Sequence, residues 1–182
     1  MAGAAALVGL PGSGKSAIGR RLGQRLQVPF VDTDQVIERR IGCSIRDFFD
    51  REGEESFRRI EAEVLADLST SFQGVLATGG GIVLREANRQ CLRSNFHVLY
   101  LRSSPEELFR RLRHDSTRPL LQVEDPLRRL GELYSKRDPL YTEIATDIVD
   151  TGRPTISAVV NLISMQLEVA NVFGGLQGSA EA

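Results

Sequence analysis

Short apolar runs alternate along the chain with longer stretches in which apolar residues recur every three or four positions. The short runs predict strands, and the longer stretches predict amphipathic helices. The predicted strands are Ala4–Val8, Val28–Asp32, Val75–Thr78, His97–Leu101 and Asp147–Asp150. This alternation is typical of βαβ units, in which helices cover a parallel sheet on both faces. The pattern therefore predicts an α/β fold.

Several of the predicted helices have recognisable start signals. Ser44–Asp47 has the capping-box pattern, and both Ser104 and Asp125 precede a proline at the first helical position. Thr155 stands where it can cap the last helix. These signals predict where at least four helices begin.

The composition is that of a soluble globular protein, since 41% of the 182 residues are hydrophobic and 26% are charged. We expect one domain over residues 1–170 and a flexible, glycine-rich tail over 171–182. The formal net charge of −1 and a pI near 6.2 give no basic surface for nucleic acid or anionic membranes. The first apolar run is too short to span a membrane, and Cys43 and Cys91 have the spacing of free thiols. We expect a cytoplasmic monomer without nucleic-acid or membrane partners.

A phosphate-binding motif follows the first predicted strand. Gly9–Ser16 reads GLPGSGKS and matches G-x-x-x-x-G-K-[ST] at every fixed position. A helical pattern with Ile18, Leu22 and Leu26 on one face follows directly. In this context backbone N–H groups converge on phosphate oxygens, Lys15 reaches the β- and γ-phosphates, and the Ser16 hydroxyl ligates Mg²⁺. The motif predicts that the chain binds a nucleoside triphosphate.

Two acidic residues end the second predicted strand. Asp32 and Asp34 are two positions apart, so their side chains are expected on one face. Ligands of open α/β sheets bind beyond the carboxyl ends of the strands, which is where the phosphate loop also lies. A pair of carboxylates there favours one group that organises a metal ion and one that engages an acceptor hydroxyl. The alternative is that Asp34 only caps the next helix.

Three consecutive glycines, Gly79–Gly81, follow the third predicted strand. Glycine is a poor strand and helix former, so the backbone there bends or meets a ligand closely. We favour a substrate-facing floor over a plain tight turn, which needs only one or two glycines.

Three arginines are candidates for binding anions. Arg58 flanks the apolar stripe of a predicted helix over Glu54–Leu68, from where its guanidinium can extend over the edge of the core. Arg118 lies in a polar loop that can close over a nucleotide, and Arg137 lies at the end of the helix that follows. The alternatives are a surface charge for Arg58, a solvent loop around Arg118, and a favourable helix C-terminal charge for Arg137.

Taken together, these residues resemble the shikimate kinase family, with order and spacing in agreement from about Leu7 to Pro154. The matching segments are GLPGSGKSAIGRRL at Gly9–Leu22, DTD at Asp32–Asp34, GEESFRRIE at Gly53–Glu61, ATGGGIV at Ala77–Val83, RPLL at Arg118–Leu121 and KRDPLY at Lys136–Tyr141. Many kinases share the phosphate loop, whereas the other segments together are much more specific.

The resemblance implies a P-loop fold of the nucleoside-monophosphate-kinase type. Its three-layer sandwich has a five-stranded parallel sheet in the order 2-3-1-4-5. The implied reaction transfers the γ-phosphoryl group of ATP, with one Mg²⁺ ion, to the 3-hydroxyl of shikimate. This step yields shikimate 3-phosphate on the way to chorismate and the aromatic amino acids.

The resemblance also assigns roles to individual residues. Asp34 would hydrogen-bond the acceptor hydroxyl and act as the base. Asp32 would hold Mg²⁺ together with Ser16. Arg58 and Arg137 would bind the shikimate carboxylate from two sides.

The other implied roles concern the glycines and the nucleotide. The ring hydroxyls would contact Gly80 within the Gly79–Gly81 floor, and residues 33–61 would form the shikimate-binding segment. Arg118 would contact phosphate from a lid over about residues 112–125, and Arg111 and Pro154 would pack against adenine. The nucleotide site would also contain Gly12, Ser13, Gly14, Lys15, Ser16 and Ala17, and the catalytic residues would be Lys15, Asp34 and Arg118.

Ala17 departs from the family pattern, which usually has threonine after the Mg²⁺-binding serine. The backbone donor remains, but a side-chain contact to phosphate is lost. Two other functions fit the phosphate loop: a kinase for another hydroxy acid, such as gluconate, and a nucleotide-dependent switch. Asp34, Arg58 and Arg137 disfavour the first, and the lack of an N-K-x-D guanine-specificity motif disfavours the second.

Overall fold

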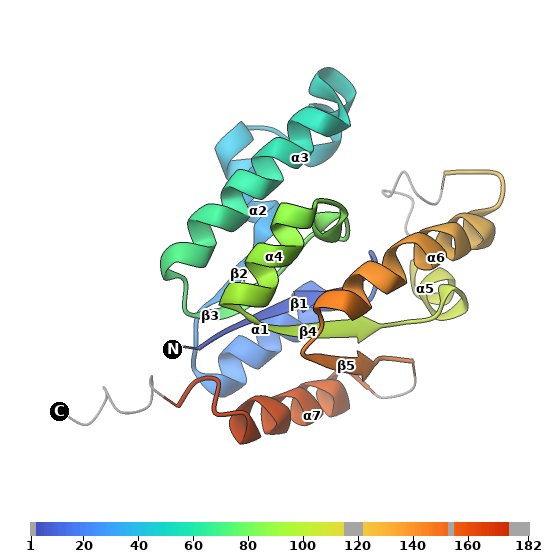
Figure 1. Cartoon of the computed structure of the whole chain (residues 1–182). Helices are drawn as coiled ribbons and strands as arrows, with labels where there is room; N and C mark the ends of the chain where they lie inside the picture. The colour runs from blue at the N-terminus through green and yellow to red at the C-terminus, as the bar shows by residue number, and fades with distance from the viewer. Residues whose placement is uncertain (1–2, 115–121, 153–154, 175–182) are drawn as a thin grey trace.

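The computed structural model describes residues 3–114, 122–152 and 155–174. Its centre is a five-stranded, fully parallel sheet in the order β2-β3-β1-β4-β5, as the family resemblance implied (Figure 1). The strands are β1 Ala4–Val8, β2 Phe30–Asp32, β3 Gly74–Ala77, β4 His97–Arg102 and β5 Asp147–Asp150. The predicted strands are therefore confirmed, with bounds that shift by at most two residues.

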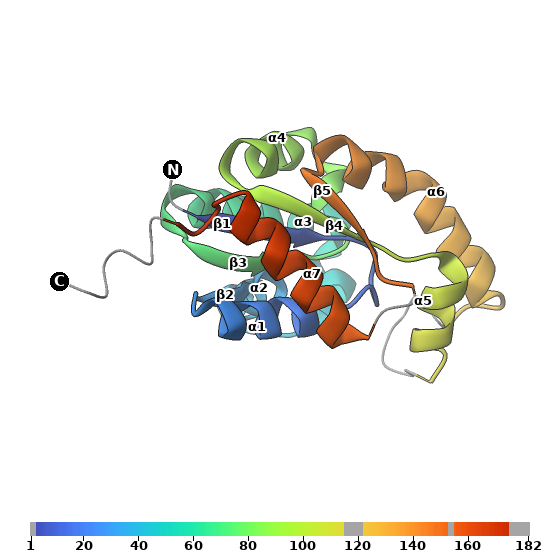
Figure 2. The ribbon, with the colours of Figure 1, turned by 90° about the horizontal axis from the view of Figure 1, so that it is seen from below.

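Helices cover both faces of the sheet, which gives three layers (Figure 2). They are α1 Lys15–Leu26, α2 Thr33–Ile41, α3 Ile45–Ser71, α4 Glu86–Asn95, α5 Pro105–Leu112, α6 Pro126–Ile144 and α7 Ile156–Val169, with a 3₁₀ turn η1 at Ile82–Leu84. Alternate residues of β1 face opposite layers, as a period of two requires. Ala4, Ala6 and Val8 pack with residues of α3, α4 and α6, whereas Ala5 and Leu7 pack with α1 and α7.

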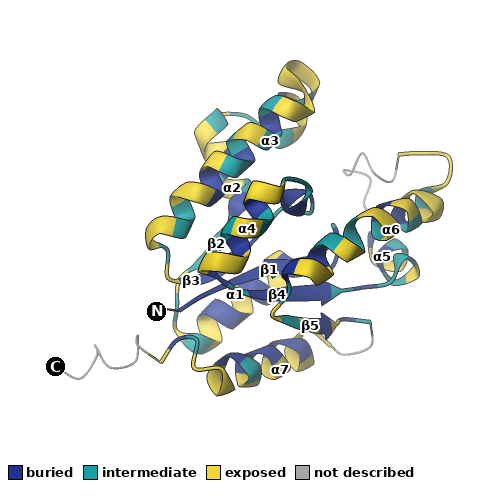
Figure 3. Cartoon of the chain, viewed as in Figure 1, coloured by how far each residue is buried: buried dark blue, intermediate teal, exposed yellow. Residues whose placement is uncertain are grey.

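Burial follows the same division, since the sides of α1 and α7 that face the sheet are buried and their outer sides are exposed (Figure 3). The sequence pattern Ile18, Leu22, Leu26 accounts for α1, because all three side chains belong to or pack against that core layer. No helix in the described ranges is long and apolar enough to cross a membrane.

The predicted helix starts are confirmed. The side chains of Ser44, Asp125 and Thr155 each accept a hydrogen bond from the backbone N–H three residues further on. Ser104 forms the complete reciprocal capping box with Glu107. At Ser44 only the serine side of the box is present, because residue 47 is an aspartate, which is shorter than the usual glutamate.

Two helices are longer than their patterns predict. The expected helix over Glu54–Leu68 extends from Ile45 to Ser71, with a break at Gly53, whose φ of 82° and ψ of 170° are not helical. We expected the segment Lys136–Tyr141 to end its helix, but α6 continues to Ile144 despite Pro139. Burial of Tyr141 and Ile144 in the core offsets the hydrogen bond that the proline cannot donate.

The expected tail is packed against the domain where the structure describes it. Phe173 is buried and Val172 packs against the layer of α1 and α7. Gly3 approaches Val172 so closely that a Cβ at that position would overlap the Val172 carbonyl. Residues 171–174 therefore belong to the domain, and the rest of the tail lies outside the described residues.

Replacing Leu22 by alanine should lower the free energy of unfolding by about 2–5 kcal/mol, because the side chain is fully buried between α1 and the sheet. Leu162→Ala is the matched control, since Leu162 on the outer side of α7 is 46% exposed. The control should change stability by less than about 0.5 kcal/mol. Urea unfolding measures both, and equal losses would contradict this packing of α1.

Candidate active site

The phosphate loop lies at the carboxyl end of β1, in the centre of the sheet. Gly12 and Gly14 have φ of 85° and 94°, in the left-handed region that favours glycine. Gly14 is the N-cap of α1, so the first amides of that helix are open to an anion. Lys15 is buried, and its Nζ donates to the carbonyls of Gly9 (2.8 Å) and Leu10 (2.9 Å). The loop therefore has the form of a phosphate cradle with its lysine at the centre.

The end of α5 backs the phosphate loop. A Cβ on Gly12 would lie 2.8 Å from Leu112 Cδ1, so only glycine fits there. Arg111 donates from Nη2 to the Thr151 carbonyl (2.6 Å) and from Nη1 to the Gly12 carbonyl (3.4 Å). Arg111 thus joins α5, the phosphate loop and the residue after β5.

Asp32 organises the acidic part of the site. Its Oδ1 accepts from the Asp34 N–H (3.0 Å) as the N-cap of α2, and its Oδ2 accepts from Ser16 Oγ (2.5 Å). The alternative that Asp34 caps this helix is therefore wrong, because Asp32 fills that position. Asp34 lies in the first turn of α2 and makes no capping bond, which leaves its carboxyl available to a ligand.

The Asp34 carboxyl has an unusual affinity for protons. Burial raises its pKa to about 6, and the neighbouring carboxylates of Asp32 and Glu61 act in the same direction, against Lys15. A pKa near neutrality is typical of a group that accepts a proton during catalysis.

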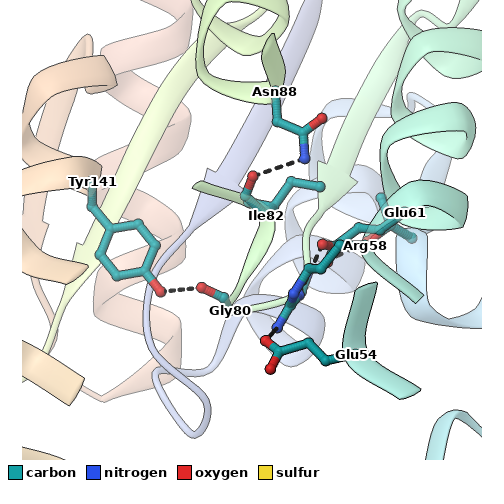
Figure 4. A network of polar contacts seen from close by, with 9 residues as sticks. Glu54, Arg58, Glu61, Gly80, Ile82, Asn88 and Tyr141 are labelled. Atoms are coloured by element: carbon teal, nitrogen blue, oxygen red, sulfur yellow. Dashed lines mark hydrogen bonds and ion pairs between the residues drawn. The ribbon is translucent and has the colours of Figure 1, made fainter. Parts of the chain in front are cut away.

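Arg58 is held by carboxylates on its own helix (Figure 4). Its Nη1 donates to Glu61 Oε2 (2.8 Å) and its Nη2 to Glu54 Oε1 (3.4 Å). Its guanidinium also lies over the rings of Phe49 and Phe57, and only 13% of its side chain is exposed. Arg58 is therefore a fixed, largely buried group and not the surface charge of the alternative reading.

The glycine segment after β3 lies against the functional side chains. A Cβ on Gly79 would lie 2.9 Å from Asp34 Oδ1 and 3.1 Å from Glu61 Oε1, and one on Gly80 would lie 2.8 Å from Pro11 Cδ. A Cβ on Gly81 would overlap the Arg58 guanidinium. The requirement for glycine here comes from space, because none of the three has a positive φ.

Arg137 joins this cluster from α6. The charge of Arg137 acts on the buried Glu61 carboxylate, as that of Arg58 does. Among the described residues, the Nε atoms of both arginines are buried without a hydrogen-bond partner. A buried donor without a partner is costly, so an anionic ligand between the two arginines would satisfy groups that the protein leaves open.

The structure brings together most of the expected site residues. Ser13, Lys15, Ser16, Asp32, Asp34, Arg58, Gly79, Gly80, Gly81 and Arg137 lie in the loop or in the cluster beside it. Ala17 follows Ser16 on α1, where it is exposed. Arg118 and Pro154 lie outside the described residues.

Sequence reasoning assigned no role to two residues of this cluster. Glu61 is 1% exposed and ion-paired to Arg58, and burial raises its pKa while the two arginines lower it. The hydroxyl of Tyr141 donates to the Gly80 carbonyl. The sequence did contain a signal for Glu61, because this glutamate lies on the apolar face of a predicted helix. A charged residue in a core is almost always paired, so its position indicates a buried cationic partner.

Comparison with known proteins gives a consistent result. The family model described as shikimate kinase matches residues 11–168. The shikimate kinase of Paracidovorax citrulli is 56% identical over 169 residues, which cover 91% of this chain and 92% of that protein. The shikimate kinase of Burkholderia lata is 50% identical over 165 residues, with 91% and 90% covered.

Solved structures agree with these relatives. The shikimate kinase from Acinetobacter baumannii in complex with shikimate has a TM-score of 0.87 and 38% identity, over 94% of this chain and 95% of that one. A gluconokinase from Sinorhizobium meliloti has a TM-score of 0.59 and 18% identity, which shows a shared fold alone. The phosphate loop, the acidic pair and the arginine cluster thus occur in a chain that belongs to the shikimate kinase family, whose members are ATP-dependent phosphotransferases.

Proposed function

We propose that this site transfers the γ-phosphoryl group of ATP to the 3-hydroxyl of shikimate and yields ADP and shikimate 3-phosphate. The proposal rests on one observation: a carboxyl group, a guanidinium group and the phosphate loop all adjoin the same glycine segment. Asp34 adjoins Gly79, the Arg58 guanidinium adjoins Gly81, and Pro11 of the phosphate loop adjoins Gly80. A small hydroxy acid bound on this segment would have a base, a cation and a phosphate donor within reach.

Arg58 and Arg137 bind the carboxylate of the acid. Each offers a buried Nε–H donor, and guanidinium groups bind carboxylates through two parallel hydrogen bonds. Glu61 holds Arg58 in place, and its negative charge lowers the net positive charge of the two arginines. This arrangement supports recognition of one anionic group at a fixed distance from Asp34.

Asp34 accepts the proton of the acceptor hydroxyl, and Lys15 contacts the β- and γ-phosphates. With the hydroxyl held by Asp34 and the carboxylate held by the arginines, the acceptor oxygen faces the phosphate loop. Positioning of this kind accounts for most of the catalysis in phosphoryl transfer.

Ser16 and Asp32 hold one Mg²⁺ ion, Asp32 through water. Their oxygens lie 2.5 Å apart at the end of the loop, and hard oxygen donors are the ligands that Mg²⁺ prefers. Mg²⁺ keeps several waters and is usually bound by one or two protein oxygens together with substrate phosphates, which fits a site with one hydroxyl and one carboxylate. When bound, the ion neutralises charge on the phosphates.

The remaining assignments concern the lid and the nucleotide. Arg118 contacts phosphate from a lid over about residues 112–125, and Arg111 and Pro154 contact adenine. Arg111 already joins the loop to Thr151, which supports a place beside the nucleotide. Ala17 offers a backbone donor only, so we expect weaker nucleotide binding than a threonine would give.

We expect the enzyme to act as a monomer. A cytoplasmic location follows from the same proposal, because the reaction consumes ATP and both cysteines are free thiols among the described residues.

A coupled ADP-release assay with ATP and Mg²⁺ tests the proposed reaction on a panel of hydroxy acids. We expect turnover with shikimate, little with gluconate, and loss of activity when EDTA removes the metal. Turnover with gluconate and none with shikimate would overturn the proposal.

Arg58→Ala should raise the KM for shikimate by about 100-fold or more. The variant removes a charge-assisted bidentate contact to the carboxylate, and it also leaves the buried Glu61 without its partner. The KM for ATP should stay within about twofold, since the hydrogen bonds of Arg58 go to Glu61 and Glu54 and none goes to the phosphate loop. Arg59→Ala is the matched control, because Arg59 is the exposed neighbour of Arg58 and carries the same charge. Steady-state kinetics compare the variants, and an equal loss of ATP affinity would show that Arg58 does not bind the acid.

The pH dependence of kcat/KM for shikimate should report the ionisation of Asp34. Because burial raises its pKa to about 6, the carboxyl is largely protonated at pH 5 and cannot accept a proton. The rate should therefore fall tenfold per pH unit below about pH 6 and level off above it. Asp34→Asn should lower kcat by about 10²–10⁴ and abolish this acid limb. An acid limb that persists in Asp34→Asn would assign it to another group.

A further inference from the structure

The Tyr141 hydroxyl reaches from α6 into the floor of the acid site. Its Oη donates to the Gly80 carbonyl at 2.5 Å, and the side chain is completely buried. Figure 4 shows the tyrosine on one side of Gly80 and Arg58 on the other. The hydroxyl thus holds the middle residue of the glycine segment from the side opposite the Arg58 guanidinium.

The glycines have no side chains of their own that could fix the position of this segment. Side chains of neighbouring helices instead bind carbonyl groups of the segment and of the turn after it. Asn88 Nδ2 donates to the Ile82 carbonyl (3.0 Å), and Arg89 Nη1 donates to the Val83 carbonyl (2.8 Å). Tyr141 is the corresponding anchor for Gly80, which lies nearest the proposed acid site.

Anchoring the carbonyl also orients the next N–H group. The peptide unit is planar and trans, so the N–H of Gly81 points opposite to the C=O of Gly80. With that carbonyl directed at Tyr141, the N–H is directed away from Tyr141. Tyr141 therefore determines where this backbone donor points.

Tyr141 also contacts the second arginine. Arg137 lies one helical turn earlier on α6, on the same side of the helix, and its charge acts on the Tyr141 hydroxyl. Burial raises the pKa of Tyr141, against the effect of Arg137, so the hydroxyl stays protonated and remains a donor at neutral pH.

We propose that Tyr141 is a positioning residue for the acceptor acid, which keeps the Gly80 peptide and the Arg137 guanidinium at one spacing. The inference rests on the proposed function, since it requires that shikimate binds between the glycine floor and the two arginines. In this role Tyr141 acts through these two groups.

Tyr141→Phe removes one oxygen atom and keeps the ring. We expect the KM for shikimate to rise about five- to tenfold, which corresponds to one lost hydrogen bond to a positioned group. The kcat and the KM for ATP should stay within about twofold. A variant that only loosens the fold would not produce this split between the two substrates.

Tyr100→Phe is the matched control. Tyr100 is 1% exposed, its ring centroid lies 4.9 Å from that of Tyr141, and its hydroxyl donates to Asp138 Oδ1. Both variants lose one buried hydroxyl from the same cluster, so both should lower the Tm by a similar amount. The control should leave the KM for shikimate within about twofold, and an equal rise in both variants would overturn the proposal.

A double-variant cycle tests the connection to Arg137. In an Arg137→Ala background, Tyr141→Phe should raise the KM by a smaller factor than in the wild type, because part of its effect acts through that arginine. If Tyr141→Phe raised the KM for shikimate by the same factor in both backgrounds, the connection between Tyr141 and Arg137 would be overturned. Kinetics are measured at a temperature at which unfolding curves show every variant folded, and a Tyr141→Phe enzyme with unchanged KM would overturn the positioning role.

Failure of the proposed function gives a different result. If the wild-type enzyme did not turn over shikimate at all, the reaction assignment would be wrong. If the wild type is active and only the Tyr141 prediction fails, the reaction stands and the positioning role does not.

Discussion

The site depends on the close approach of one backbone segment to three groups from separate elements. Gly79–Gly81 leaves β3 beside Asp34 of α2, Pro11 of the phosphate loop and Arg58 of α3, with no room for a Cβ at any of the three positions. A side chain there would displace the Asp34 carboxyl, the phosphate loop or the Arg58 guanidinium. The absence of side chains is what lets these three groups meet at one backbone segment.

The charges around this floor are interdependent. Glu61 is almost completely buried, which is tolerable only because Arg58 neutralises it at 2.8 Å. The same carboxylate, together with burial and Asp32, raises the pKa of Asp34. The residue that holds Arg58 therefore also raises the proton affinity of the neighbouring Asp34 carboxyl, so Glu61 links the electrostatics of these two groups.

Helix α6 connects the floor to the rest of the core. It carries Arg137 and Tyr141 one turn apart, and it continues through Pro139 because the residues beyond that proline are buried. The helical turn beyond Pro139 is the one that carries Tyr141, whose hydroxyl reaches Gly80. Core packing at the end of α6 thus maintains a contact inside the site.

Much of the fold and part of the site follow from the sequence alone. Hydrophobic periodicity and capping residues predicted the strands and helix starts, and the motif Gly9–Ser16 predicted the phosphate loop, because these are local properties of consecutive residues. The family resemblance predicted the sheet order, which the structure confirms, and the residues proposed for the acid site. Tertiary structure alone decided that Asp32 and not Asp34 caps α2, and that α6 continues beyond Pro139. It also decided that Phe173 belongs to the core and that Glu61 and Tyr141 hold Arg58 and Gly80. The Tyr141–Gly80 and Phe173 contacts join residues distant in the chain, and such contacts have no periodic signal in the sequence. The Asp32 cap and the Arg58–Glu61 pair are short-range, but the Ser16 hydroxyl fixes the first and burial in the folded domain fixes the second.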